Sequence, residues 1–163
     1  MLRPWNKNDQ PGNDITKLLS LRVIDETYNT RSHFEVTEMV GLEMNYEVLQ
    51  EGHVLWLGYN IHNQYGVNVF DTHSVSSELY KKTHEKGKYR AIAWIPGNLL
   101  NAGGYYIGCA IFNHLKKIIH FHEKEILFFN IYETVDENNA RGMSGDDFPG
   151  VIRPLLKWVI DRV

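Results

Sequence analysis

The sequence contains one cysteine and no long apolar run, and each shortage excludes a class of protein. Cys109 cannot form an internal disulfide. It lies inside an apolar alternating segment, so we interpret it as a buried free thiol in a reducing compartment. No apolar stretch approaches the roughly 20 residues that a membrane-spanning helix needs. The polar residues after Met1 do not resemble the apolar segment of a secretory signal. These absences favour a soluble, cytoplasmic protein.

The chain also lacks an excess of positive charge. Its formal net charge is -3 with neutral histidines, and its pI is near 6.2. The cluster Lys116–Lys117 is too short to form a patch for nucleic acid or anionic lipid. We therefore expect no nucleic-acid partner. The length of 163 residues suffices for one domain with a substantial core.

Signatures of the common enzyme classes are missing as well. The sequence has no phosphate-binding GxxxxGK[ST] segment, no GxSxG nucleophile elbow, no HExxH zinc motif and no CxxC pair. Glu35 and Glu133 lie in expected strands, but nothing marks them as the paired carboxylates of a glycosidase. We therefore predict a protein that is not an enzyme and that has no cofactor.

Two metal sites are weak alternatives. His120 and His122 alternate along an expected strand close to His114, and they could share one face as zinc ligands if a third ligand and supporting hydrogen bonds were present. Oxygen ligands for calcium are offered by a polar loop containing Asp136, Glu137, Asp146 and Asp147. Their spacing matches no calcium loop. Solvated side chains explain both groups more simply, so we predict no metal.

Alternating apolar residues dominate the chain and predict an all-β fold. Gly, Asn and Pro separate the alternating segments, and no long helical pattern is present. We expect about eight strands, in the ranges 15–25, 34–49, 54–63, 67–75, 89–95, 105–113, 118–121 and 126–135, with a bulge or bend at Gly41. Two packed antiparallel sheets, as in a jelly-roll or immunoglobulin-like sandwich, accommodate them. Residues 1–14 resemble a linker-like leader, and residues 15–163 form the expected domain.

The alternation assigns each strand residue to one of two faces. Leu57, Tyr59 and Ile61 are core-like, as are the corresponding residues of 105–113 and 126–135. The opposite face mixes flat aromatic rings with amides and an imidazole, which suits sugars because they present an apolar ring face and a rim of hydroxyls. A covering loop, tail or subunit is the alternative reading of this face. The candidate carbohydrate-binding residues are Trp56, Asn60, His62, Tyr106, Phe128, Asn130 and Tyr132.

The C-terminal segment 150–163 is apolar although it is terminal. As a last strand it would lie at a sheet edge, where an exposed apolar strand tends to pair with another chain. We therefore expect a homodimer that shares or exchanges this strand, with a strand packed on its own sheet as the alternative.

Several segments together resemble a known family. These are ITKLLSLRVID, LGYNIHNQYGVNVFDT, IPGNLLNAGGYYIGCAI and the final GVIRPLLKW, which span most of the chain. They are similar to the C-terminal carbohydrate-binding domain of Wzt-type proteins, the ATP-binding subunits of ABC transporters that export O-antigen and related polysaccharides.

The resemblance implies a dimeric sandwich that exchanges its terminal strand and recognises a finished polysaccharide, often at a modified non-reducing end. Its expected partners are that glycan and the membrane subunit of the transporter. No Walker motif precedes Ile15, so we expect an excised domain or a free-standing relative and attribute no ATP hydrolysis to it. A protein-interaction module that uses the same aromatic face is the alternative function.

Overall fold

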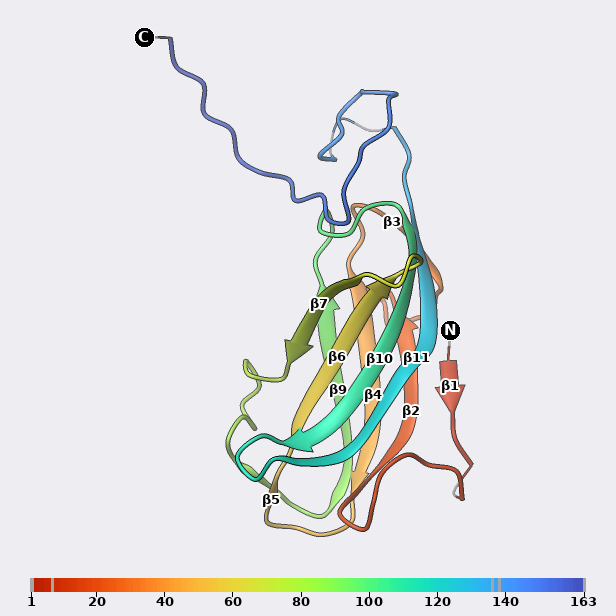
Figure 1. Cartoon of the computed structure of the whole chain (residues 1–163), viewed down its shortest axis with the longest axis vertical. Helices are drawn as coiled ribbons and strands as arrows, with labels where there is room; N and C mark the ends of the chain where they lie inside the picture. Colours follow the sequence, from red (N-terminus) through yellow and green to blue (C-terminus); the bar gives the residue numbers. More distant parts are fainter. Residues whose placement is uncertain (1, 7, 136, 138, 163) are drawn as a thin grey trace.

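The protein is a sandwich of two β-sheets, seen in a computed structural model that describes residues 2–6, 8–135, 137 and 139–162 (Figure 1). Sheet A has the order β1-β2-β4-β9, formed by Leu2–Pro4, Thr16–Ile24, Val40–Val48 and Gly87–Ile95. Sheet B has the order β3-β11-β10-β6-β7, formed by His33–Glu35, Ile118–Tyr132, Gly103–Asn113, Trp56–Asn63 and Asn68–His73. The short strands β5 (His53–Val54) and β8 (Thr83–His84) pair with each other. The predicted all-β sandwich is confirmed.

The core lies between the two sheets and follows the predicted alternation. In β10, Tyr105, Ile107, Cys109 and Ile111 are buried, and they face the buried even-numbered residues of β4. Cys109 is a free, buried thiol, and burial raises its pKa to about 12, which keeps it protonated. Each fully buried Leu or Ile side chain stabilises the fold by about 1.5–3 kcal/mol.

The strand boundaries differ from the predictions at two places. The expected strand 34–49 divides into β3 and β4, because residues 36–39 leave the ladder before β4 begins. The bulge expected at Gly41 is absent, since Gly41 pairs regularly with Ile24 and Trp94. A side chain at Gly41 would place its Cβ 2.6 Å from Cγ1 of Ile24 and 2.7 Å from the Trp94 ring. The glycine therefore provides space for Trp94 on the outer surface of sheet A.

The predicted strands 118–121 and 126–135 are one long strand, β11. It pairs with β10 along its length, with register shifts between Ile107 and Cys109 and between Ile111 and Phe112. Between the two predicted segments, His122 and Glu123 pair with β10, and residues 124–126 form a bulge rather than a loop. This bulge becomes important for the candidate site.

Residues 2–4 of the expected leader form β1, which pairs with β2 at the edge of sheet A. Trp5 packs against the core immediately after β1. Part of this leader therefore contributes to the sandwich.

The C-terminal tail does not form the strand on its own sheet that was the alternative to an exchanged strand. Among the described residues of 151–162, only Ile152 makes a bridge, to Leu100, and the chain beyond Pro154 extends away from the sandwich (Figure 1). Trp158 is 81% exposed and Ile160 is 88% exposed. The described part of the chain contains no helix long and apolar enough to cross a bilayer.

An ion-pair cluster fixes the point where this tail leaves the domain. Arg153 is fully buried, and its Nη2 lies 2.5 Å from Oε1 of Glu133. Arg141 Nη1 lies 2.7 Å from the other oxygen of Glu133. The backbone N–H of Arg153 also donates to the carbonyl of Leu99. Removing Arg153 would leave Glu133 with less compensation for its burial, so this residue belongs to the folded domain rather than to the free tail.

Buried histidines make the stability of the fold sensitive to mild acid. Burial lowers the pKa of His84, whose Nε2 lies 3.2 Å from the Tyr46 hydroxyl, and burial also lowers the pKa of His120. The unfolded chain therefore takes up protons at a higher pH than the folded chain, and stability falls as pH drops below about 6.5. The carboxyl groups with lowered pKa, such as Glu43, lose their contribution only below their ordinary value of 4.5.

We therefore expect the Tm to fall between about pH 7.5 and pH 5.5, and the fall to be smaller in His84→Gln. Thermal unfolding followed by circular dichroism at both pH values measures the difference. An equal fall in the parent and the variant would show that His84 does not contribute.

Candidate functional site

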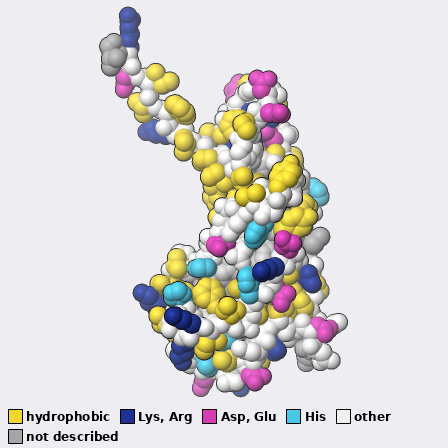
Figure 2. Space-filling view, in the orientation of Figure 1, with side chains coloured by type: hydrophobic (Ala, Val, Ile, Leu, Met, Phe, Trp, Pro, Cys, Tyr) yellow, Lys and Arg dark blue, Asp and Glu magenta, His cyan; other side chains and the backbone are white. Residues whose placement is uncertain are grey.

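The candidate site lies on the outer face of sheet B, which is turned toward the viewer in Figure 2. The strand registers place its residues side by side. Asn60 of β6 lies opposite Asp71 of β7 and Gly108 of β10. One step along, His62 lies opposite Tyr106, and Tyr106 lies opposite Phe128 of β11. Asn60, His62, Tyr106 and Phe128 therefore form one continuous group.

A hollow of about 380 Å³ opens in this face. It lies over four strands and the β6–β7 turn, and most of its lining residues are polar or charged. The lining residues are Asn60, His62, Gly66, Asn68, Gly108, His122, Lys124 and Glu125. The volume falls within the range of about 300–1,000 Å³ that is usual for small-ligand sites. The hollow can therefore receive a group of the size of one sugar ring.

A chain of hydrogen bonds orders one side of the hollow. Asn60 Nδ2 donates to Oδ1 of Asp71 over 2.8 Å, and its Oδ1 lies 3.0 Å from His122 Nε2. Because the amide oxygen of Asn60 can only accept, His122 donates from Nε2 and leaves Nδ1 available as an acceptor when the ring is neutral. The side chains are thus held in defined orientations before any ligand arrives.

The carboxylate of Asp71 is the fixed charge at this end of the site. Its pKa is lowered, mainly by the hydrogen bond from Asn60 and further by Asn68, whose Nδ2 lies 3.1 Å from Oδ1. Asp71 is therefore ionised at neutral pH. Both amide donors reach the same oxygen, and ligand hydroxyls could donate to the other.

A bulge in β11 forms the other side of the hollow. Between the pairs Ile107–Leu127 and Cys109–Glu123, β10 contributes one residue, Gly108, whereas β11 contributes residues 124–126. A Cβ on Gly108 would lie 2.8 Å from the carbonyl oxygen of Glu123. Glycine is therefore required opposite the bulge, and the bulge places Lys124 and Glu125 beside the hollow.

An aromatic pair borders the hollow next to His62. The rings of Tyr106 and Phe128 have centroids 5.0 Å apart and are tilted by 55°. Phe128 lies over Gly104, where a Cβ would approach its ring to 2.7 Å. Tyr106 remains 38% exposed. This pair offers an apolar surface adjacent to the polar groups.

The remaining sequence-predicted residues lie apart from this group. Trp56 is six residues from His62 along β6, which is about 20 Å in a strand, and it is only 8% exposed. Its indole stacks on the His114 ring with centroids 5.2 Å apart, and its centroid lies 4.8 Å from that of the Tyr80 ring. Asn130 and Tyr132 lie beyond Phe128, beside β3. The rings of Tyr80 and His114 thus cover Trp56, which offers little surface to a ligand.

Sequence reasoning missed several residues of the hollow, namely Asn68, Gly108, Lys124 and Glu125, and it missed Asp71 beside the hollow. The segment 67–75 was the expected hairpin partner of 54–63, but Asn68 and Asp71 are three residues apart, and only the register shift in the β6–β7 pairing brings both beside Asn60 and His62. The bulge residues also carried no signal, since two predicted strands were separated there.

The metal alternatives are not supported by the geometry. The register shift near Phe121 separates His120, which is buried and lies 3.0 Å from Asn13 Nδ2, from His122 on the outer face. Within the described ranges no group of three or more His, Cys, Asp or Glu side chains could hold a metal ion. Asp136 of the calcium alternative lies outside the described residues.

The glycosidase alternative also lacks a free carboxylate pair. Glu133 is bound by Arg141 and Arg153. Glu35 accepts hydrogen bonds from the backbone and hydroxyl of Thr37. Both carboxylates serve local structure.

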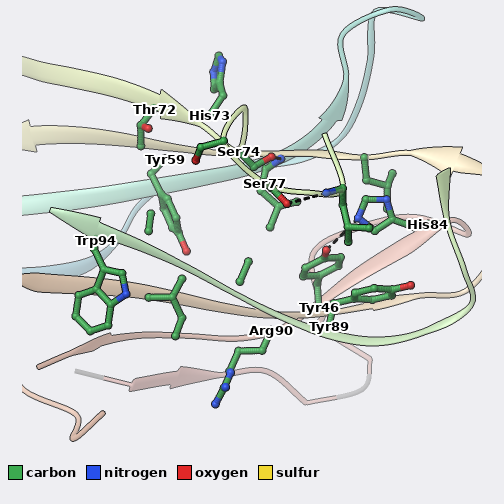
Figure 3. Close-up of a pocket in the computed structure, with 17 residues that line it drawn as sticks. Tyr46, Tyr59, Thr72, His73, Ser74, Ser77, His84, Tyr89, Arg90 and Trp94 are labelled. Carbon is green, nitrogen blue, oxygen red and sulfur yellow. Dashed lines mark hydrogen bonds between the residues drawn. The ribbon is translucent and has the colours of Figure 1, made fainter. Parts of the chain in front are cut away.

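A second, larger hollow of about 580 Å³ opens between the sheets at the edge formed by β7 and β9 (Figure 3). Aromatic rings of Tyr46, Tyr59 and Tyr89 line it, together with apolar side chains such as Leu57 and Ala91. Strands β7 and β9 are edge strands of their sheets, so each has an unpaired side. This interlayer cleft suits an extended apolar segment more than a polar ligand.

Comparison with known proteins identifies what the chain is similar to. The family model described as the Wzt C-terminal domain matches residues 7–146. A solved structure titled "Crystal structure of the C-terminal domain of wzt" superposes with a TM-score of 0.71 and 12% sequence identity, covering 98% of this chain and 93% of that chain. The likeness to this structure shows the fold. No curated protein sequence matches the chain.

Proposed function

Because the chain belongs to the Wzt C-terminal domain family, which is associated with ABC exporters of O-antigen and related polysaccharides, we propose that it binds the exported polysaccharide without catalysing a reaction. The proposed site is the outer face of sheet B around the hollow. Its ligand would be the non-reducing end of the finished glycan, presented to the transporter's membrane subunit on the cytoplasmic side.

The observation that carries this proposal is the adjacency of Tyr106 and Phe128 to a polar hollow with preoriented groups. Sugar rings stack their apolar face on aromatic rings, and their hydroxyls both donate and accept hydrogen bonds. The carboxylate of Asp71 is held in place as one hydrogen-bond acceptor, and His122 Nδ1 is a second. The side-chain amide of Asn68 also lines the hollow. This combination of hydrogen-bonding groups and aromatic surface supports the binding of one sugar residue.

We further propose that the protein is a homodimer in which the tail of each chain enters the interlayer cleft of the other. The tail presents exposed apolar side chains: Leu155, Leu156, Trp158, Val159 and Ile160. The cleft offers apolar walls and the unpaired edges of β7 and β9, so a tail strand could add both backbone hydrogen bonds and buried area. Two sites in one dimer would strengthen weak single-site binding through avidity.

The test of the proposed function is direct binding of the purified protein to a glycan array that includes bacterial O-antigen polysaccharides. We expect selective binding to a small set of glycans that share a terminal structure. Absence of binding to every glycan, together with capture of the transporter's membrane subunit through this aromatic face, would instead support the protein-interaction module.

A further inference from the structure

The charges around the hollow bear on which sugar it accepts. Glu125 is the one carboxylate and Lys124 the one lysine among the described lining residues, and the carboxylate of Asp71 lies beside the lining, where it accepts hydrogen bonds from Asn60 and Asn68. No arginine lines it. Sites that bind phosphate or carboxylate groups use paired Arg side chains, clustered Lys or backbone N–H groups at a helix end, and the described lining offers none of these arrangements.

Resting on the proposed function, we infer that the hollow selects a neutral sugar residue through adjacent hydroxyl groups, and that the β11 bulge at Lys124–Glu125 determines this specificity. Hydroxyls donate short, charge-assisted hydrogen bonds to carboxylates. A phosphate, sulfate or uronate at the same place would lie near the carboxylates of Asp71 and Glu125, which carry charge of the same sign and would repel it.

The backbone of the bulge gives independent support for a role of Glu125. This residue has a φ of 51°, in the left-handed region, within a strand. Non-glycine residues adopt that conformation at a cost, and glycine would relieve it. Glu125 is exposed, so burial does not account for a glutamate at this position. Strained residues that persist tend to lie at functional sites.

The geometry around the bulge is also rigid. Gly108 must remain a glycine because the carbonyl of Glu123 lies over it, and the pairing resumes on both sides at Leu127 and Glu123. Asn60 and His122 hold the facing side through their hydrogen bond. Asp71 on β7, held by Asn60, and Glu125 on the β11 bulge therefore flank the hollow.

The first test compares matched pairs of array glycans that share a terminal sugar and differ by one phosphate, sulfate or carboxylate on it. We expect the neutral member of each recognised pair to bind at least tenfold more tightly. Tighter binding of the anionic member would overturn the inference while leaving the proposed function intact. Failure of every glycan to bind would overturn the proposed function itself.

The second test uses Glu125→Gly and Glu125→Gln in the full chain. Glu125→Gly removes the carboxylate and the backbone strain together, so its Tm should equal or exceed that of the parent while affinity for the best neutral glycan falls about tenfold. Glu125→Gln should keep the shape and also weaken binding. Glu26→Gln, an exposed carboxylate beside sheet A, is the matched control and should change neither property. Unchanged affinity in both Glu125 variants would overturn the inference.

Discussion

Replacing Tyr106 with alanine is expected to reduce binding of the recognised polysaccharide at least tenfold without unfolding the domain. The ring is 38% exposed and packs on Phe128 at the border of the hollow, so the substitution removes half of the aromatic surface offered to a sugar. A tenfold loss corresponds to about 1.4 kcal/mol, which is within the range of one aromatic contact. Isothermal titration calorimetry with the best array glycan measures the loss, and thermal unfolding shows that the fold is retained.

Tyr28→Ala is the matched control for this prediction. Tyr28 is likewise exposed, but it belongs to the surface of sheet A, where its ring contacts Trp94 edge to face. We expect its glycan affinity to equal that of the parent. Equal losses in the two variants would mean that the aromatic pair of sheet B is not the binding surface.

Trp56→Ala is not a clean test of the same idea. The indole is buried beneath Tyr80 and His114, so its removal leaves a cavity and costs about 3–5 kcal/mol of stability. Loss of binding in that variant would follow from damage to the face as a whole.

Removing residues 155–163 is expected to convert the proposed dimer into a folded monomer. The segment holds most of the exposed apolar side chains of the tail, and each would contribute up to about 1.5–3 kcal/mol on burial in a partner. Dimer affinity should therefore fall by at least 100-fold. Size-exclusion chromatography with light scattering, at matched protein concentrations, measures the mass of both forms.

The truncation must end after Pro154 rather than at Gly150. Arg153 is fully buried and pairs with Glu133, so a shorter chain would lose a structural ion pair together with the tail. Substitution of Trp158 and Ile160 by serine in the full chain is the second form of the test. A dimer of unchanged affinity in both proteins would contradict the exchange of the tail, whereas a monomeric parent would show that no dimer forms.

The layers of the fold could be predicted from the sequence because one rule governs them. Residues two apart in a strand share a face, and this assigned Tyr59, Ile61, Ile107 and Cys109 correctly to the core. The rule also placed Asn60, His62 and Tyr106 on the opposite face, where the registers bring them together. Local alternation carries this information without knowledge of the strand order.

The parts that could not be predicted depend on contacts between distant segments or on irregular backbone. The bulge at Lys124–Glu125 has no marker in its own segment, and its partner Gly108 resembles any small residue of a strand. The cover over Trp56 comes from Tyr80 in a loop and His114 in a turn, neither of which alternation describes. His120 and His122 fell on different faces because a register shift interrupts the alternation between them.

The same reasoning explains why the tail was expected to be a strand. Its composition is that of a strand, but a strand forms only where a partner supplies hydrogen bonds, and within the described residues the tail has a single bridge through Ile152. The sequence of the tail therefore indicates that it can form a strand with a second chain, rather than that it forms one within its own chain.

Titration of the isotope-labelled protein with an oligosaccharide from the recognised polysaccharide, followed by backbone amide NMR, tests the central claim most directly. We expect shifts to concentrate at Asn60, His62, Tyr106, His122 and Glu125, with saturation at one sugar-binding site per chain. Shifts confined to the outer surface of sheet A or to the interlayer cleft, or no shifts with a glycan that the array shows to bind, would contradict the assignment of the site to sheet B.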